Sequence, residues 1–379
     1  METIAICCDS QKRSKSIERL RVFRRKEYLD RVPVLFGVEA RYLLAARGVG
    51  FLEYFQSPES NLRHQLMNFK WRMEHLEDDG LGSESVTVFP DFQNTTTAGL
   101  FNFSAITFRD TDPPRVAPFI HSIGELRRLE PPDLGKEMGG KKEFFLLRMR
   151  ELAKDFTVEV NGEPIPIIVS HGWHETMGTG ALDMLGESFF VWLLEYPQEM
   201  QDFLQMLTKA SIDYERTMRG ISGVSADGGE AIADGMEMLS KEMFDQFIIP
   251  PYLRYYEEFP GSMRGLHMCG KIDHLLVSIR FALRVTMLNG FGFCVDRTRL
   301  ARLIGTQMSC SGGLNPMTLW RGTDEEVWAD VRSCTAELGP SRAFMLGDGY
   351  NVIPATPTER MNSVVRQADE IGLAFLSRA

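Results

Sequence analysis

The chain has 379 residues, of which 44% are hydrophobic and 25% are charged, and this suits one large or two medium-sized domains with a substantial core. Its net charge of −10, with no recurring basic patch, argues against nucleic acid as a partner. No apolar run reaches about 18 residues, so we expect no membrane span. Six cysteines in a chain of this length, and an N-terminus that is charged at once, indicate reduced thiols, no signal peptide and a cytoplasmic protein.

The first segment of the chain is basic. Between Lys12 and Lys26 the cations alternate with Leu20, Val22 and Phe23, which is typical of an amphipathic helix with one solvated face. We therefore expect residues 1–31 to form an N-terminal helical extension, and residues 32–379 to form the main domain.

The main domain alternates between short apolar runs and helical patterns. The expected strands are Val32–Val38, Ser85–Pro90, Pro164–Val169, Ala231–Ala233, Met263–Leu266, Val285–Leu288, Thr306–Ser309 and Ala343–Leu346. Strands that are each followed by a helix pair in parallel, and about eight such units predict an α/β fold of the (β/α)₈ TIM-barrel type. An open doubly wound sheet is the alternative, but no G-x-G-x-x-G motif follows the first strand.

Polar residues follow the predicted strands, at the carboxyl ends where TIM barrels carry their active sites. They are Glu39, Asp91, His171, His174, Asp234, His267, Cys269, Asn289, Cys310, Asp348 and Tyr350. We assign acid–base roles to His171, Asp348 and Tyr350. Substrate contacts are expected from Asp91, His174 and Asn289, and from the apolar residues Met177 and Phe291.

The pair His267 and Cys269 carries the most chemical information. Residues i and i+2 of a strand point to the same side, so the imidazole and the thiol project together. With Cys310 from a neighbouring strand, they form a zinc site with an open position. Asp234 or Glu237 can supply the third ligand in place of His267, and the sequence leaves this choice open.

Several short motifs resemble the uroporphyrinogen decarboxylase superfamily. They are His267-Met-Cys-Gly270, Gly312-Gly-Leu-Asn-Pro316, Gly347-Asp-Gly-Tyr350 with the following Thr356-Pro357, and the weaker Ala233-Asp-Gly-Met236. The resemblance implies a (β/α)₈ barrel with one of two activities: porphyrinogen decarboxylation or corrinoid-dependent methyl transfer.

The decarboxylase branch implies an arginine-rich N-terminal motif, but here Arg41 stands alone. The thiol methyltransferases carry a zinc-binding cysteine in the segment that corresponds to Asp348-Gly-Tyr350, where this chain has none. The pair Cys269 and Cys310, with an upstream acid, is more similar to the aryl-methyl-ether O-demethylases, whose zinc is held by two cysteines and a carboxylate.

The resemblance therefore implies a zinc-dependent methyltransferase that moves a methyl group from a methoxylated aromatic to cob(I)alamin, the cobalamin being carried by a partner corrinoid protein. A methylcobamide:thiol methyltransferase, a decarboxylase and a non-enzymatic corrinoid-binding scaffold are the alternatives. The oligomeric state, with a homodimer as one option, stays open.

Overall fold

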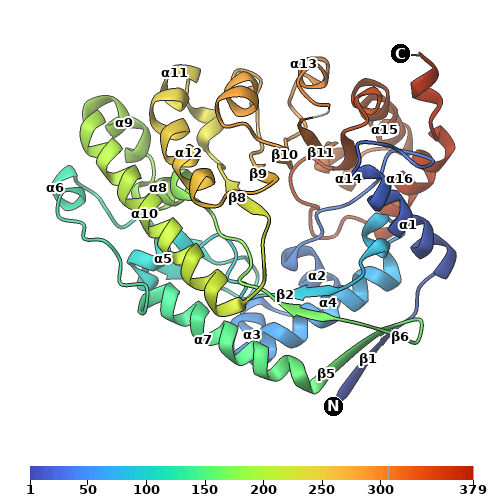
Figure 1. The fold of residues 1–379 in the computed structure, drawn as a ribbon, viewed down its shortest axis with the longest axis horizontal. Coiled ribbons are helices and arrows are strands. Elements are labelled where there is room, and N and C mark those ends of the chain that lie inside the picture. Colours follow the sequence, from blue (N-terminus) through green and yellow to red (C-terminus); the bar gives the residue numbers. More distant parts are fainter. Residues whose placement is uncertain (306, 379) are drawn as a thin grey trace.

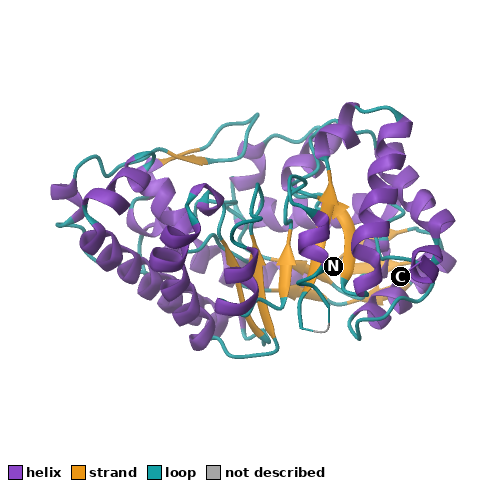
Figure 2. Cartoon of the chain, turned by 90° about the horizontal axis from the view of Figure 1, so that it is seen from above, coloured by secondary structure: helices purple, strands orange, loops and turns teal. Residues whose placement is uncertain are grey.

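The structure is a computed structural model that describes residues 1–305 and 307–378. Its centre is a parallel sheet of five strands in the order β12-β11-β10-β9-β8. Their bounds are β8 (Gly228–Ile232), β9 (Met263–His267), β10 (Met287–Asn289), β11 (Ser309–Leu314) and β12 (Phe344–Asp348). Figure 2 shows the strands gathered in the middle of the molecule with helices on both sides.

Three further strand positions complete the barrel. The strands β2 (Val86–Val88) and β7 (Ile167–Val169) pair in parallel, and Val34 forms a parallel bridge to Leu346 of β12. All eight predicted strand positions therefore occur in the predicted order, and the (β/α)₈ barrel is confirmed. In the part of the chain that the structure describes, no strand pairing joins β7 to β8 or the segment 32–38 to β2.

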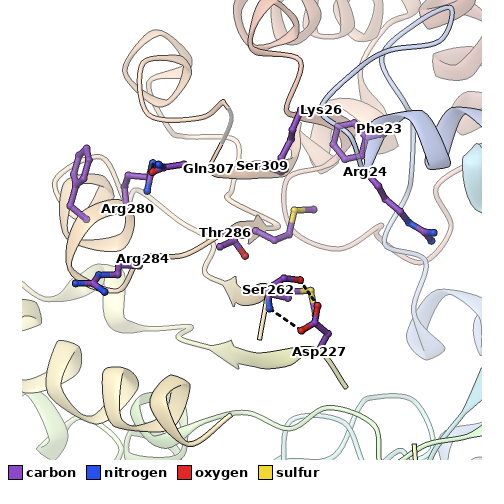
Figure 3. Close-up of a pocket in the computed structure, with 13 residues that line it drawn as sticks. Phe23, Arg24, Lys26, Asp227, Ser262, Arg280, Arg284, Thr286, Gln307 and Ser309 are labelled. Carbon is purple, nitrogen blue, oxygen red and sulfur yellow. Dashed lines mark hydrogen bonds between the residues drawn. The ribbon is translucent and has the colours of Figure 1, made fainter. Parts of the chain in front are cut away.

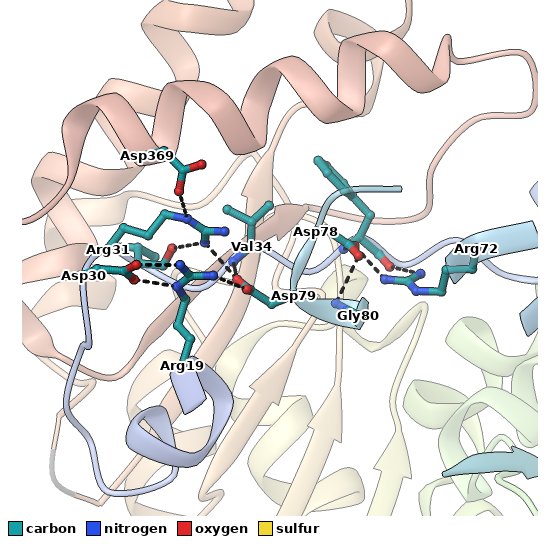
Figure 4. A network of polar contacts seen from close by, with 11 residues as sticks. Arg19, Asp30, Arg31, Val34, Arg72, Asp78, Asp79, Gly80 and Asp369 are labelled. Atoms are coloured by element: carbon teal, nitrogen blue, oxygen red, sulfur yellow. Dashed lines mark hydrogen bonds and ion pairs between the residues drawn. The ribbon is translucent and has the colours of Figure 1, made fainter. Parts of the chain in front are cut away.

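Along the segment 32–38, two carboxylates accept backbone hydrogen bonds that a neighbouring strand would otherwise accept (Figure 4). Asp79 Oδ2 accepts the backbone N–H of Val34 at 2.8 Å, and Asp78 Oδ2 accepts that of Phe36 at 2.9 Å. Arg19 and Arg31 donate to the two oxygens of Asp79 at 2.5 and 2.8 Å. Backbone groups that a barrel strand would otherwise leave unpaired are satisfied in this way.

The helices surround the strands and bury the main hydrophobic core between the two layers (Figure 1). Their bounds are α1 (Ser10–Phe23), α2 (Ala40–Arg47), α3 (Phe51–Phe55), α4 (Pro58–His75), α5 (Thr96–Phe101), α6 (Ile123–Leu126), α7 (Glu137–Leu152), α8 (Met177–Leu185), α9 (Ser188–Glu195), α10 (Pro197–Ser222), α11 (Lys241–Met243), α12 (Ile249–Glu258), α13 (Arg297–Ala301), α14 (Pro316–Arg321), α15 (Asp324–Leu338) and α16 (Thr358–Ile371). Local signals explain some starts: Thr323 and Glu326 form a capping box at α15. No helix in the described ranges is long and apolar enough to cross a membrane.

The N-terminal extension differs from the prediction. Residues 10–23 form the expected helix, but Glu2–Ile6 form a strand, β1, which pairs in parallel with β5 (Phe156–Val160). With β6 (Glu163–Ile165), these strands form a separate sheet at the lower edge of the view in Figure 1. A short antiparallel pair, β3 (Ile106–Thr107) and β4 (Arg115–Val116), lies between α5 and α6.

The predicted strand Thr306–Ser309 is displaced along the chain. Its first residue lies outside the described residues, and β11 begins only at Ser309. Cys310 is therefore the second residue of a strand and does not follow its end. This shift changes the interpretation of the metal site.

Candidate metal centre and cavity

Three side chains meet beyond the carboxyl ends of β8 and β9. The register pairs Ile232 with His267, so Asp234 and Cys269, each two residues further on, leave the sheet at the same height. Asp234 Oδ1 lies 3.4 Å from Cys269 Sγ and 3.5 Å from His267 Nε2. The three donor atoms lie within 4.8 Å of one another, which is close enough to share one metal ion.

The chemistry of this cluster fits a divalent cation. Burial, reinforced by the Asp234 carboxylate, raises the pKa of the Cys269 thiol well above its usual range. A thiolate beside a carboxylate is unfavourable unless a cation neutralises both. One nitrogen, one oxygen and one sulfur donor suit zinc, and three protein ligands would leave a position open for a substrate.

Glu237 lies next to this cluster and adds a second carboxylate to it. Burial raises its pKa, and its Oε2 is buried without a hydrogen-bond partner among the described residues. An orphaned buried carboxylate oxygen beside a metal-type cluster calls for a cation or a proton. Gly270, at φ +94°, leaves the room that Glu237 needs, because a Cβ there would lie 2.7 Å from Glu237 Cγ.

The imidazole of His267 also depends on a glycine. A Cβ on Gly290, which has φ +57°, would lie 2.6 Å from His267 Cε1. The turn after β10 therefore provides the space in which the ring of His267 lies.

A cavity of about 240 Å³ opens beside the cluster, inside the barrel. Its lining residues are Glu39, Asn94, Trp173, His174, Glu230, Ala231, Ile232, Asp234, Gly265, His267, Asn289, Tyr350 and Asn351. Three carboxylates and two imidazoles face a space that is otherwise lined by amides, aromatic rings and backbone. The cavity is therefore suited to a small polar ligand, and its lining carboxylates disfavour a strongly anionic one.

Glu39 and Glu230 also line the cavity; the sequence placed Glu39 at the expected active-site edge without a role, and Glu230 was not predicted. Both side chains are accessible to solvent in the open cavity, but the protein atoms around them limit their hydration. This loss of hydration, together with the charges of Asp91 and Asp348, raises the pKa of Glu39 to about 7. The same loss of hydration raises the pKa of Glu230. The signal for Glu39 was its position directly after the first strand, and the signal for Glu230 was a lone acid inside the run Gly-Gly-Glu-Ala-Ile.

Glu215, a buried acid on α10, contacts both of the predicted histidines, His171 and His174. His171 Nε2 lies 3.0 Å from Glu215 Oε1, and His174 Nδ1 lies 3.5 Å from Glu215 Oε2. Burial opposes the ionisation of Glu215, but the hydrogen bond from His171 and the nearby charges of His174 and Arg219 lower its pKa to about 2. Burial lowers the pKa of His174 to about 4, so this cavity residue is neutral near pH 7.

The remaining predicted polar residues divide into two groups. Asn289, predicted as a substrate contact, and Tyr350, predicted as an acid–base residue, both line the cavity. Asp91 and Asp348 are buried away from it: Asp91 accepts the Tyr54 hydroxyl at 2.7 Å, and Asp348 accepts the Gly37 backbone N–H at 2.6 Å. Their negative charges raise the pKa of Glu39, which lines the cavity, but neither carboxylate is itself part of the wall.

Cys310 does not join the cluster, and the prediction that it lies beside Cys269 is wrong. Cys310 pairs with Leu288 and Leu288 with Leu266, whereas Asn289 pairs with both Ser311 and His267. Because side chains alternate along a strand, Cys310 points to the opposite face of the sheet from His267. It is fully buried.

Two predicted apolar contacts are also corrected. Phe291 and Met177 are fully buried in the core and are absent from the cavity wall. Phe291 packs in the space beside Gly312 and Gly313, where a Cβ on either glycine would lie 3.5 or 3.2 Å from its ring.

With this geometry in place, comparison with known proteins identifies the family. The model of the uroporphyrinogen decarboxylase (URO-D) family matches residues 15–371. The chain belongs to this family. A curated relative, the uroporphyrinogen decarboxylase of Dictyostelium discoideum, is 22% identical over 270 residues, which cover 68% of this chain and 70% of the relative.

Among solved structures, a methyltransferase from Methanosarcina mazei superposes with a TM-score of 0.66 at 20% identity. The match covers 94% of this chain and 99% of the methyltransferase. This likeness shows the shared barrel fold. Membership of the family supports an enzyme.

Proposed function

We propose that this chain is a zinc-dependent methyltransferase that takes a methyl group from a small methoxylated aromatic and passes it to cob(I)alamin on a partner corrinoid protein. The observation that carries the proposal is the convergence of Asp234, His267 and Cys269 at the edge of a cavity. Zinc held by these residues would supply Lewis acidity to the ether oxygen of the donor.

The cavity favours methyl transfer over porphyrinogen decarboxylation. Its volume of about 240 Å³ is below the usual range for drug-sized ligands, so it suits one aromatic ring better than a tetrapyrrole. Its wall carries the carboxylates of Glu39, Glu230 and Asp234 but no arginine or lysine. A substrate with many carboxylates would meet repulsion there without the cations needed to bind it.

The chain's own residues have defined tasks in this reaction. Trp173 and Tyr350 offer aromatic faces for a ring, and Asn289 offers an amide for its polar substituents. When the methyl carbon–oxygen bond breaks and the methyl–cobalt bond forms, the departing phenolate needs a proton. Glu39, with its pKa raised to about 7, and the hydroxyl of Tyr350 are the cavity groups able to donate it.

The test is an assay with the purified chain, a reduced corrinoid protein and a set of methoxyarenes, in which the released phenol is measured by chromatography. We expect Cys269→Ser and His267→Ala to lower the rate by at least about 100-fold, since each removes a metal ligand. Cys294→Ser, the same change at an exposed cysteine, should leave the rate unchanged.

Other results of the same experiment would support the alternatives. Methylation of a thiol with no phenol from any methoxyarene would favour the thiol methyltransferase. Release of carbon dioxide from uroporphyrinogen without a corrinoid protein would favour the decarboxylase. Full activity of Cys269→Ser would contradict the metal-based proposal.

A further inference from the structure

A second, larger cleft lies at the opposite end of the same barrel strands (Figure 3). Its volume is about 1100 Å³, and its floor is formed by the first residues of three strands: Met263 of β9, Met287 of β10 and Ser309 of β11. His267 comes four positions after Met263, which corresponds to about 13 Å along the strand. The cleft is therefore separate from the proposed metal centre.

The wall of this cleft is cationic, although the chain as a whole is acidic. Arg24, Lys26, Arg280 and Arg284 line it, against a single acid, Asp227. The carboxylate of Asp227 is already engaged by Ser262, whose backbone N–H donates to it at 2.9 Å and whose hydroxyl also contacts it. Positive charge is therefore in excess inside the cleft.

None of the four cations has a carboxylate partner among the residues described. Lys26 donates to the hydroxyl of Ser309, and Arg280 donates to Gln307 Oε1 at 2.5 Å and to the Leu303 carbonyl at 3.3 Å. The side chains of Arg24 and Arg284 form no hydrogen bond or ion pair with the residues whose side chains the structure describes, 1–305 and 307–376. Elsewhere on this molecule, arginines commonly pair with acids, as Arg63 does with Glu2 at 2.7 Å.

Two of the cations are held by an unusual backbone. Lys26 has φ +62° and Arg284 has φ +56°, in the left-handed region that side-chain-bearing residues seldom adopt. Each costs about 1–2 kcal/mol relative to an ordinary conformation. Lys26 follows the end of α1 and Arg284 follows the end of the helix Ser278–Ala282, so the left-handed conformation ends each helix at a residue that lines the cleft.

The cleft also offers an apolar surface beside the charges. The ring of Phe281 is 61% exposed, and the Arg280 guanidinium lies 5.3 Å from its centre. Met263 and Met287 on the floor are half-buried. A flat group could stack on Phe281 while its anionic end reaches the guanidinium groups.

We propose that this cleft binds a small organic polyanion: several phosphate or carboxylate oxygens joined to a flat apolar group. Arginine forks hold such oxygens in pairs, and the half-buried Lys26 adds a point charge. The site is independent of the metal centre, so its ligand is distinct from the methyl donor.

Isothermal titration calorimetry at low salt tests this site, with three probes: ATP without magnesium, a benzene tricarboxylate and inorganic pyrophosphate. We expect ATP, the tricarboxylate or both to bind in the micromolar range, and pyrophosphate, which lacks the flat group, to bind more weakly. The difference between ATP and the tricarboxylate shows whether the natural anion is a phosphate or a carboxylate. Because surface charges are screened by salt, added salt should weaken binding.

Variants locate the site. Lys26→Glu and Arg284→Glu should each weaken binding by at least about tenfold, while Arg128→Glu, the same charge change on the exposed segment after α6, should not. Binding should persist in His267→Ala, which disrupts only the metal centre. If neither organic probe binds, or if Lys26→Glu and Arg284→Glu bind as Arg128→Glu does, the proposal is overturned.

Discussion

The two cysteines that the sequence predicted to be neighbours lie on different sides of the sheet. Cys269 follows β9 and lies 3.4 Å from Asp234, whereas Cys310 lies within β11 and faces the outer side of the sheet. Both residues follow apolar runs, so their composition could not distinguish them. The alternation of faces has a period of two, and an error of one residue in a strand boundary moves a side chain to the other face.

Other residues of the site were predictable because they follow strand ends directly. His267, Asn289, Asp234 and Tyr350 reach the cavity as expected. Glu215 could not be found in the same way, because it lies on α10 and approaches His171 and His174 only through packing of that helix. Sequence periodicity does not report which residue of a long helix meets a given loop.

Asp348 gives a prediction about pH. Burial raises its pKa to about 6, from an ordinary value near 3.8, so the folded state prefers the protonated acid. Between these two values the folded chain binds more protons than the unfolded chain, and stability falls as pH rises from about 4 to about 6. Asp348→Asn removes this loss, so the variant should gain about 2–3 kcal/mol relative to the unmodified chain between pH 4 and pH 7.

Denaturant unfolding of both proteins across this pH range measures the effect. Asp369→Asn, at an exposed acid, is the control and should show no such change over the same window. A stability difference between Asp348→Asn and the unmodified chain that stays constant from pH 4 to pH 7 would show that Asp348 is ionised in both states.

At the scale of elements, the barrel depends on side chains where strand pairing is interrupted. The sequence predicted all eight strand positions, because each is an apolar run followed by a helix. It could not predict that Asp78 and Asp79 hold the backbone of the segment 32–38, since this requires two acids to lie beside a strand more than 40 residues earlier. Nor did it predict β1, whose partner β5 follows about 150 residues later.

Because of these contacts, we expect the stability of the fold to depend strongly on Asp79. Its side chain is fully buried, and Asp79→Ala would leave Arg19, Arg31 and the Val34 N–H without that acceptor. Removing one partner from a buried ion pair typically costs about 3–5 kcal/mol. We expect a loss of this size in the free energy of unfolding, measured by urea denaturation.

Asp369 provides the matched comparison, because it contacts the same Arg31 at 2.6 Å but its side chain is 56% exposed. Asp369→Ala should cost less than about 1 kcal/mol, as exposed pairs usually do. Equal losses for Asp79→Ala and Asp369→Ala would mean that the buried carboxylate of Asp79 does not stabilise the barrel.

At the scale of the whole molecule, the two ends of the barrel differ in charge. The carboxyl end carries an acidic cavity with Asp234, His267 and Cys269, and the amino end carries a cleft lined by four cations. The net charge of −10 gave no sign of this division. Clefts lined by one sign of charge concentrate ligands of the other, so the two ends are suited to different molecules.

We propose that Asp234, His267 and Cys269 hold zinc and that Cys310 does not. Elemental analysis tests it on the purified chain and on Cys269→Ser and Cys310→Ser, each loaded with zinc, freed of unbound metal and checked for folding by circular dichroism. We predict about one zinc per chain for the unmodified protein and for Cys310→Ser, and close to none for Cys269→Ser. Zinc retained by Cys269→Ser, or lost from a folded Cys310→Ser, would contradict the account.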